Sequence, residues 1–132
     1  YFDMDDFKEL IDKLGHAVGD DALKELCNSM RKFVRSQDPI IRMGGDEFTL
    51  LLPGCNAKKA EKIARNILDD TRTLQCHGES LRASIGLAVS DPDKDITLNA
   101  LIQNADKAMY IAKALGGNRL ELAPTTSNET AE

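Results

Sequence analysis

The amino-acid sequence predicts an α+β domain in which helices pack against a mainly antiparallel sheet. Apolar residues recur at helical spacing in several segments, which is the pattern of amphipathic helices. Residues 81–89 alternate between apolar and other types, and a Gly-Gly pair separates two β-prone runs within residues 40–52. In chain order the elements are β-α-α-β-β-α-β-α-β. With 132 residues, the chain is long enough for one domain with its own core.

The first part of the chain predicts the end of a strand followed by two helices. Residues 1–5 are interpreted as the strand end. Apolar positions in residues 7–14 lie on one face of a helix, which the following glycine stops. Asp20 is expected to be the N-cap of a second helix. Its apolar stripe runs to Val34, and the Asp-Pro pair at 38–39 ends it.

Residues 42–48 carry a glycine pair, Gly44-Gly45, followed by an acidic pair, Asp46-Glu47. Two β-prone runs joined by such a segment predict a β-hairpin, since glycine alone adopts a positive φ without steric cost. The hairpin tip then carries two carboxylates beside backbone without side chains. This combination suits a hard divalent cation with a phosphate against the glycines. Gly-Gly-Asp is also an ordinary turn, so the segment alone does not decide function.

The second half of the chain predicts two more helices. One begins at Asn56 or Ala57, and the other runs from its cap Thr97 to Leu115. Gly116 is typical of the position just after a helix C-terminus. The remaining expected elements are a strand at 81–89, a short strand at 119–122 and a polar, disordered tail at 123–132.

Composition excludes some classes of protein. Acidic residues number 22 against 17 basic ones, for a net charge of −5, which argues against a general nucleic-acid binder. No apolar run approaches the ~20 residues of a membrane span, so no membrane contact by this domain is expected. Cys27, Cys55 and Cys76 are an odd number without metal-ligand spacing, which favours a reducing, cytoplasmic location.

Several separated motifs occur together in a fixed order. They are Asp3-Met4-Asp5-Asp6-Phe7-Lys8, Gly15-His16, Gly19-Asp20, the 42–48 segment, Ser84-Ile85-Gly86, residues 105–113 and Gly116-Gly117-Asn118. Up to about Leu122 the chain resembles the GGDEF family, the diguanylate cyclase domains of bacterial signalling. The resemblance implies the palm-like core that this family shares with polymerases and nucleotidyl cyclases. It also implies that residues 1–122 form a GGDEF domain without the family's leading helix and the first half of its first strand.

The resemblance implies a reaction in which a homodimer, within a longer multidomain chain, condenses two GTP molecules into cyclic di-GMP. Mg²⁺ or Mn²⁺ would be held by the Asp3 carboxylate, the Met4 carbonyl, Asp46 and Glu47. Glu47, Asp46 and Lys8 are the expected catalytic residues.

The same resemblance assigns residues to the substrate. Lys8 and Lys113 match phosphate-contacting lysines, although either is also an ordinary surface lysine, and Gly44 and Gly45 would let the phosphates approach the backbone. Asp20 matches the carboxylate that binds the guanine edge.

Two positions depart from the family pattern. Ile11 stands where the family usually has asparagine, and isoleucine cannot hydrogen-bond a purine. Losing one such bond costs roughly 0.5–3 kcal/mol, up to about a hundredfold in affinity. Gly117 stands where many members have arginine or lysine.

Arg35 and Asp38 form an Arg-x-x-Asp motif that ends five residues before Gly44. This offset matches the family's inhibitory site for its product. The alternative is an arginine near a helix C-terminus followed by a turn. An alternative function also remains open, because Ile11 and Gly117 favour a catalytically weak domain that binds or senses GTP or cyclic di-GMP. A dimerisation module without a ligand is the third alternative, which the acidic hairpin opposes.

Overall fold

The computed structural model describes residues 1–124 of the chain. Its helices are α1 (Phe7–Leu14), α2 (His16–Lys32), α3 (Ala57–Arg72) and α4 (Leu98–Ala114). Its strands are β1 (Phe2–Met4), β2 (Ile40–Gly44), β3 (Glu47–Leu50), β4 (Gln75–Cys76), β5 (Glu79–Ser80), β6 (Ala83–Leu87) and β7 (Arg119–Leu122).

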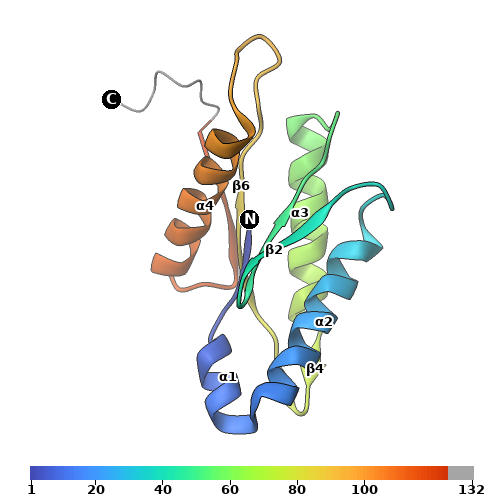
Figure 1. Cartoon of the computed structure of the whole chain (residues 1–132), viewed down its shortest axis with the longest axis vertical. Coiled ribbons are helices and arrows are strands. Elements are labelled where there is room, and N and C mark those ends of the chain that lie inside the picture. Colours follow the sequence, from blue (N-terminus) through green and yellow to red (C-terminus); the bar gives the residue numbers. More distant parts are fainter. Residues whose placement is uncertain (125–132) are drawn as a thin grey trace.

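Five strands form one sheet in the order β2-β3-β1-β6-β7, and β4 pairs only with β5 in a small hairpin. Every neighbouring pair is antiparallel except β6 and β7. Figure 1 shows α4 on one side of the sheet and α2 and α3 on the other. The predicted α+β fold with a mainly antiparallel sheet is therefore confirmed.

The alternation of side chains along β1 separates the hydrophobic core from the face of the sheet that α4 covers. Phe2 and Met4 are almost fully buried and join a cluster with Leu26, Met30 and other residues of α2 and α3. Asp3, between them, points to the opposite face, toward α4. The first strand thus anchors the core with two side chains and presents a carboxylate with the third.

The helix α4 lies directly against β6. A Cβ atom added to Gly86 would lie 2.0 Å from the carbonyl oxygen of Ala105 and 2.3 Å from the backbone nitrogen of Met109. Ala108 and Ala112 are also buried along this helix. Small side chains on α4 and glycine on β6 therefore let the two backbones touch.

Two structural expectations were wrong in detail. Asp20 is not an N-cap, because α2 begins at His16 immediately after Gly15, which places Asp20 inside the helix. The hairpin forms as expected, but neither Gly44 nor Gly45 has a positive φ, so conformational need does not explain the glycine pair. The hairpin β4–β5 was not expected, because strands of two residues carry no readable alternation.

The predicted caps of α3 and α4 are confirmed, whereas the strand predicted at 81–89 is shorter, Ala83–Leu87. The Asn56 side chain caps α3 by accepting from Lys59 N, and Thr97 caps α4 by accepting from Ala100 N. Ala123, the first residue of the predicted tail, donates its N–H to Leu87 O at 2.8 Å, and residues 125–132 lie outside the described part. Within residues 1–124, no helix combines the length and apolar character needed to span a bilayer.

Candidate functional site

The carboxylates predicted to act together meet where β1 ends beside the β2–β3 hairpin. Asp3 and Glu47 are directly opposite each other in the β1–β3 ladder. Met4 N donates to Asp46 O at 3.2 Å, which holds the hairpin tip against the end of β1. The structure thus brings Asp3 together with Asp46 and Glu47, which lie more than forty positions further along the sequence.

Asp3 is unusual in its electrostatics. Its side chain is 13% exposed, and its buried Oδ1 atom has the Lys113 ammonium as its ion-pair partner. Burial, together with the neighbouring Asp46 carboxyl, raises the pKa of Asp3 from 3.8 to about 7, although the Lys113 ammonium opposes the shift. Two neighbouring carboxyls, one of them largely removed from water, form a site that a further cation would stabilise.

Lys113, in the last turn of α4, supplies the positive charge of this cluster. Its Nζ lies 3.2 Å from Asp3 Oδ1 and 3.4 Å from Asp5 Oδ1. Burial opposes the charged form, but the two carboxylates prevail and raise the pKa of Lys113 above its ordinary value. Lys113 is therefore a permanent cation at the site.

Asp5 connects β6 and the turn after α4 to the acidic cluster. It accepts hydrogen bonds from Ser84 Oγ at 2.6 Å and from Asn118 N at 2.6 Å. Ser84 is fully buried, so its hydroxyl has a structural partner in Asp5. The Ser-Ile-Gly motif signalled that residue 84 matters, but sequence reasoning assigned no role to it.

Glu47 accepts a hydrogen bond at Oε1 from the Tyr1 hydroxyl, at 3.4 Å. Burial and the Glu47 carboxylate raise the pKa of Tyr1 to about 12. The phenol therefore remains protonated and can serve as a donor at neutral pH. Sequence reasoning missed this contact.

The hairpin glycines provide open space. A Cβ at Gly45 would meet no atom within 4 Å, and one at Gly44 would lie 3.4 Å from Glu47 Oε2. Arg42 holds the turn by donating from Nη2 to Gly45 O at 2.7 Å and from Nε to Gly44 O at 3.2 Å. The turn is thus fixed while its outer side stays free of side chains.

These residues fit a magnesium-type cation bound together with a phosphate. Among residues 1–124, no three His, Cys, Asp or Glu side chains converge into a complete metal site. Mg²⁺ is usually bound by one or two carboxylates and completed by waters and substrate phosphates. Asp3 and Asp46, with the Met4 carbonyl and Glu47 nearby, offer such a partial set.

The residues predicted for the guanine base lie at the junction of α1 and α2. Ile11 packs on Gly19, because a Cβ added there would lie 2.9 Å from Ile11 Cγ1. Asp20, the next residue, is exposed, as is Lys8 in the first turn of α1. Ile11 therefore packs against the residue that precedes Asp20, and it offers a purine no hydrogen-bonding group.

Arg35 and Asp38 bind each other. Arg35 Nη2 lies 2.8 Å from Asp38 Oδ1, and the Arg35 N–H donates to Asp38 Oδ2 at 2.9 Å. Arg35 also donates to Pro53 O at 2.9 Å, while Asp38 is 2% exposed. The hydrogen bonds from Arg35 lower the pKa of Asp38. The motif forms a closed ion pair in the loop between α2 and β2.

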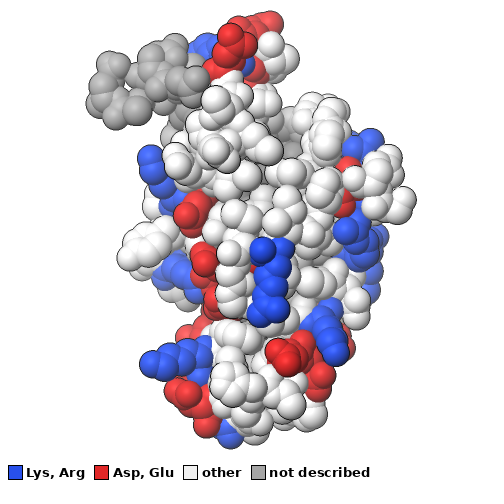
Figure 2. Space-filling view, in the orientation of Figure 1, with Lys and Arg blue, Asp and Glu red and all other residues white. Residues whose placement is uncertain are grey.

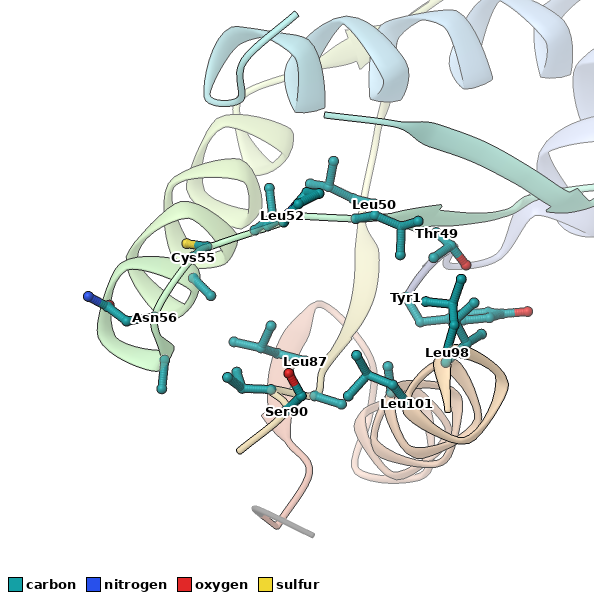
Figure 3. Close-up of a pocket in the computed structure, with 18 of the residues that line it drawn as sticks. Tyr1, Thr49, Leu50, Leu52, Cys55, Asn56, Leu87, Ser90, Leu98 and Leu101 are labelled. Carbon is teal, nitrogen blue, oxygen red and sulfur yellow. The ribbon is translucent and has the colours of Figure 1, made fainter. Parts of the chain in front are cut away.

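A cavity of about 880 Å³ opens on the other side of Tyr1. Figure 3 shows it between the end of β3, the start of α3 and the start of α4. It is lined mainly by apolar residues, among them Leu50, Leu52, Leu87, Leu98 and Leu101. The Thr49 hydroxyl, buried at its edge, has no hydrogen-bond partner within residues 1–124. An apolar lining does not suit a triphosphate, so the acidic cluster remains the candidate site.

Surface charge is mixed on the face that Figure 2 shows. Acidic and basic side chains are interspersed, one basic side chain lies near the centre, and the described residues form no continuous basic surface on this face. This distribution agrees with the acidic balance of the sequence.

Comparison with known proteins supplies the family. The profile of the family described as "Diguanylate cyclase, GGDEF domain" matches residues 1–119. The diguanylate cyclase DgcS of Shewanella oneidensis is 38% identical over 124 residues, which cover 93% of this chain and 41% of that protein. The chain spans between 27% and 41% of the length of the first curated relatives that it matches.

Solved structures of domains named GGDEF or GGEEF have a similar fold. The GGDEF domain of PA1120 (YfiN or TpbB) from Pseudomonas aeruginosa has a TM-score of 0.83 and 37% identity, covering 95% of this chain and 80% of that one. The active GGEEF domain of a diguanylate cyclase from Vibrio cholerae has a TM-score of 0.85 and 26% identity, covering 95% and 81%. With the acidic hairpin, the palm-like sheet and a profile match over nine tenths of its length, this chain belongs to the GGDEF family of diguanylate cyclase domains.

Proposed function

We propose that this domain condenses two GTP molecules into cyclic di-GMP with release of two pyrophosphates, each protomer of a homodimer holding one GTP. The 3′-hydroxyl of each GTP attacks the α-phosphate of the other. The observation that supports this best is the cluster of Asp3, Asp46 and Lys113 beside the side-chain-free turn at Gly44 and Gly45.

The chain's own residues would hold and orient the triphosphate. Asp3, Asp46, Glu47 and the Met4 carbonyl would hold Mg²⁺ or Mn²⁺, which when bound neutralises phosphate charge and helps ionise the attacking hydroxyl. Lys113 already lies at the cluster and would contact the phosphates, with the exposed Lys8 approaching from α1.

The test is to incubate the purified protein with GTP and Mn²⁺ and to detect cyclic di-GMP by mass spectrometry. Glu47→Ala should lower turnover by at least about a hundredfold, because a pre-positioned group at the reacting phosphate is lost. Glu61→Ala removes an exposed carboxylate on α3 and serves as the matched control. Product formation that survives in Glu47→Ala would refute the assigned site.

A second candidate function is supported by Ile11, an apolar residue that packs on Gly19, the neighbour of Asp20 in the chain. In this alternative the domain binds GTP or cyclic di-GMP but turns over slowly. ATP run in parallel with GTP addresses base selectivity, because Ile11 provides no group to distinguish the purines. Binding of GTP without any product would favour the alternative.

The Arg35–Asp38 pair leads to a prediction about product inhibition. We expect added cyclic di-GMP to slow the wild-type enzyme, with Arg35 and Asp38 binding the product. Arg35→Ala should raise the inhibition constant about 10- to 100-fold, the range expected for lost hydrogen bonds to a charged group. Initial rates measured against added product check this.

Because Arg35→Ala leaves Asp38 buried without its cation, Arg35→Lys is the companion variant. It keeps the positive charge but loses the planar fork that matches a guanine edge. Equal inhibition of all three proteins would show that the product binds elsewhere.

A further inference from the structure

The turn between α4 and β7 has an unusual backbone. Gly116, Gly117 and Asn118 have φ values of 113°, 74° and 53°, so three consecutive residues are in left-handed or related conformations. Glycine adopts such angles without steric cost, so Asn118 is the residue of this turn whose conformation most needs support from its surroundings. Two of its N–H groups bond back to α4, from Gly116 to Lys113 O at 3.1 Å and from Gly117 to Ala112 O at 2.9 Å.

Two distant side chains hold the last residue of this turn. Asp5 accepts from Asn118 N at 2.6 Å. Arg72, the last residue of α3, donates from Nε to Asn118 Oδ1 at 3.0 Å and from Nη2 to Asn118 O at 2.7 Å. Since α3 and α4 lie on opposite sides of the sheet (Figure 1), Arg72 joins the two layers through this one residue.

The turn is connected to the candidate active site by a short path. Asp5, which holds Asn118, also lies 3.4 Å from Lys113 Nζ. A Cβ at Gly117 would lie 2.8 Å from Asp5 Oδ2, so the absence of a side chain there lets the carboxylate reach the turn. The positions of Asp5 and Lys113 therefore depend on how firmly the turn is held.

We propose that Arg72 is a positioning residue that fixes the turn of residues 116–118 and, through Asp5, places Lys113 for its contact with the GTP phosphates. The phosphate part of this inference rests on the proposed function. The planar guanidinium satisfies two acceptors of Asn118 at once, which a flexible ammonium does not do in the same geometry. Arg72 acts through Lys113 and Asn118 without contact with the substrate.

The first measurement is the binding of α,β-methylene GTP, which cannot be condensed, in the presence of Mg²⁺. Arg72→Ala should weaken binding about tenfold. If Arg72 acts through Lys113, the double variant Arg72→Ala/Lys113→Ala should bind no more weakly than Lys113→Ala alone. The proposal is overturned if the two substitutions weaken binding additively in the double variant, or if Arg72→Ala binds the analogue as tightly as the wild type.

Arg65→Ala is the matched control. Arg65 is on the same helix and pairs with Glu61 one turn away, at 2.9 Å. Its loss should leave nucleotide binding unchanged. If Arg65→Ala lost as much affinity for the nucleotide as Arg72→Ala, the cause would be a general weakening of α3, and the proposal would be overturned.

The second measurement needs no nucleotide. Hydrogen exchange at the amides of Gly117 and Asn118 should accelerate in Arg72→Ala but not in Arg65→Ala. Unchanged exchange in Arg72→Ala overturns the proposal. If the wild-type protein fails to bind the analogue, the proposed function and the phosphate part of this inference both fail, and exchange then decides whether Arg72 holds the turn.

Discussion

Asp3→Asn is expected to slow cyclic di-GMP formation severely while making the metal-free domain more stable at pH 8. The substitution removes a carboxylate from the proposed cation site, and losing several kcal/mol of charge stabilisation slows turnover on the order of a thousandfold. The same substitution removes a buried charge that has Asp46 as its neighbour. Lys113 keeps Asp5 as its partner in the variant.

The pH dependence follows from the direction of the shift. Asp3 has a pKa of about 7 in the folded chain and an ordinary value of 3.8. Between these values the folded state binds more protons than the unfolded state, so the free energy of unfolding falls as pH rises through this window. Asparagine does not titrate, so this decrease in the free energy of unfolding is absent from the variant.

Urea unfolding in the presence of a chelator, at pH 5 and at pH 8, checks the prediction. The two proteins should differ little at pH 5, where Asp3 is protonated, and the variant should be more stable at pH 8. If the wild-type protein loses no more stability than Asp3→Asn between pH 5 and pH 8, the raised pKa of Asp3 is contradicted.

Gly86→Ala is expected to destabilise the fold by about 3 kcal/mol or more, because the added methyl group meets backbone atoms of α4 that cannot rotate away. The helix would have to move outward, which separates the buried alanines from the sheet. For a domain of this size the melting temperature should fall by roughly 10 °C or more. Thermal unfolding followed by circular dichroism measures this.

Gly45→Ala provides the comparison for stability. Its added Cβ meets nothing within 4 Å and its φ is not positive, so the melting temperature should change by no more than roughly 2 °C. Similar losses in both variants would mean that contact with α4 is not the reason for glycine at position 86.

The sequence was most informative where one local signal decides one local structure. Caps at Asn56 and Thr97 were readable because a short polar side chain satisfies nearby N–H groups. Asp20 has the same chemistry, but α2 already begins at His16 after Gly15, so Asp20 lies inside the helix. Residue type alone does not separate these cases.

Contacts between distant segments were less predictable. The resemblance placed Lys113 near the phosphates, but its simultaneous approach to Asp3 and Asp5 depends on how α4 crosses the sheet. The need for glycine at position 86 depends on the same crossing. Arg72 and Asn118 are forty-six positions apart, and no periodicity connects them.

The closed pair of Arg35 and Asp38 has a consequence for the concentration at which the product would act. Both carboxylate oxygens of Asp38 already accept hydrogen bonds from Arg35, so a bound guanine would have to displace an internal competitor. The apparent affinity for the product is then the intrinsic affinity multiplied by the small fraction of molecules in which the pair is open. Substitutions that loosen the Arg35–Pro53 contact would shift this threshold downward without altering any atom that touches the product.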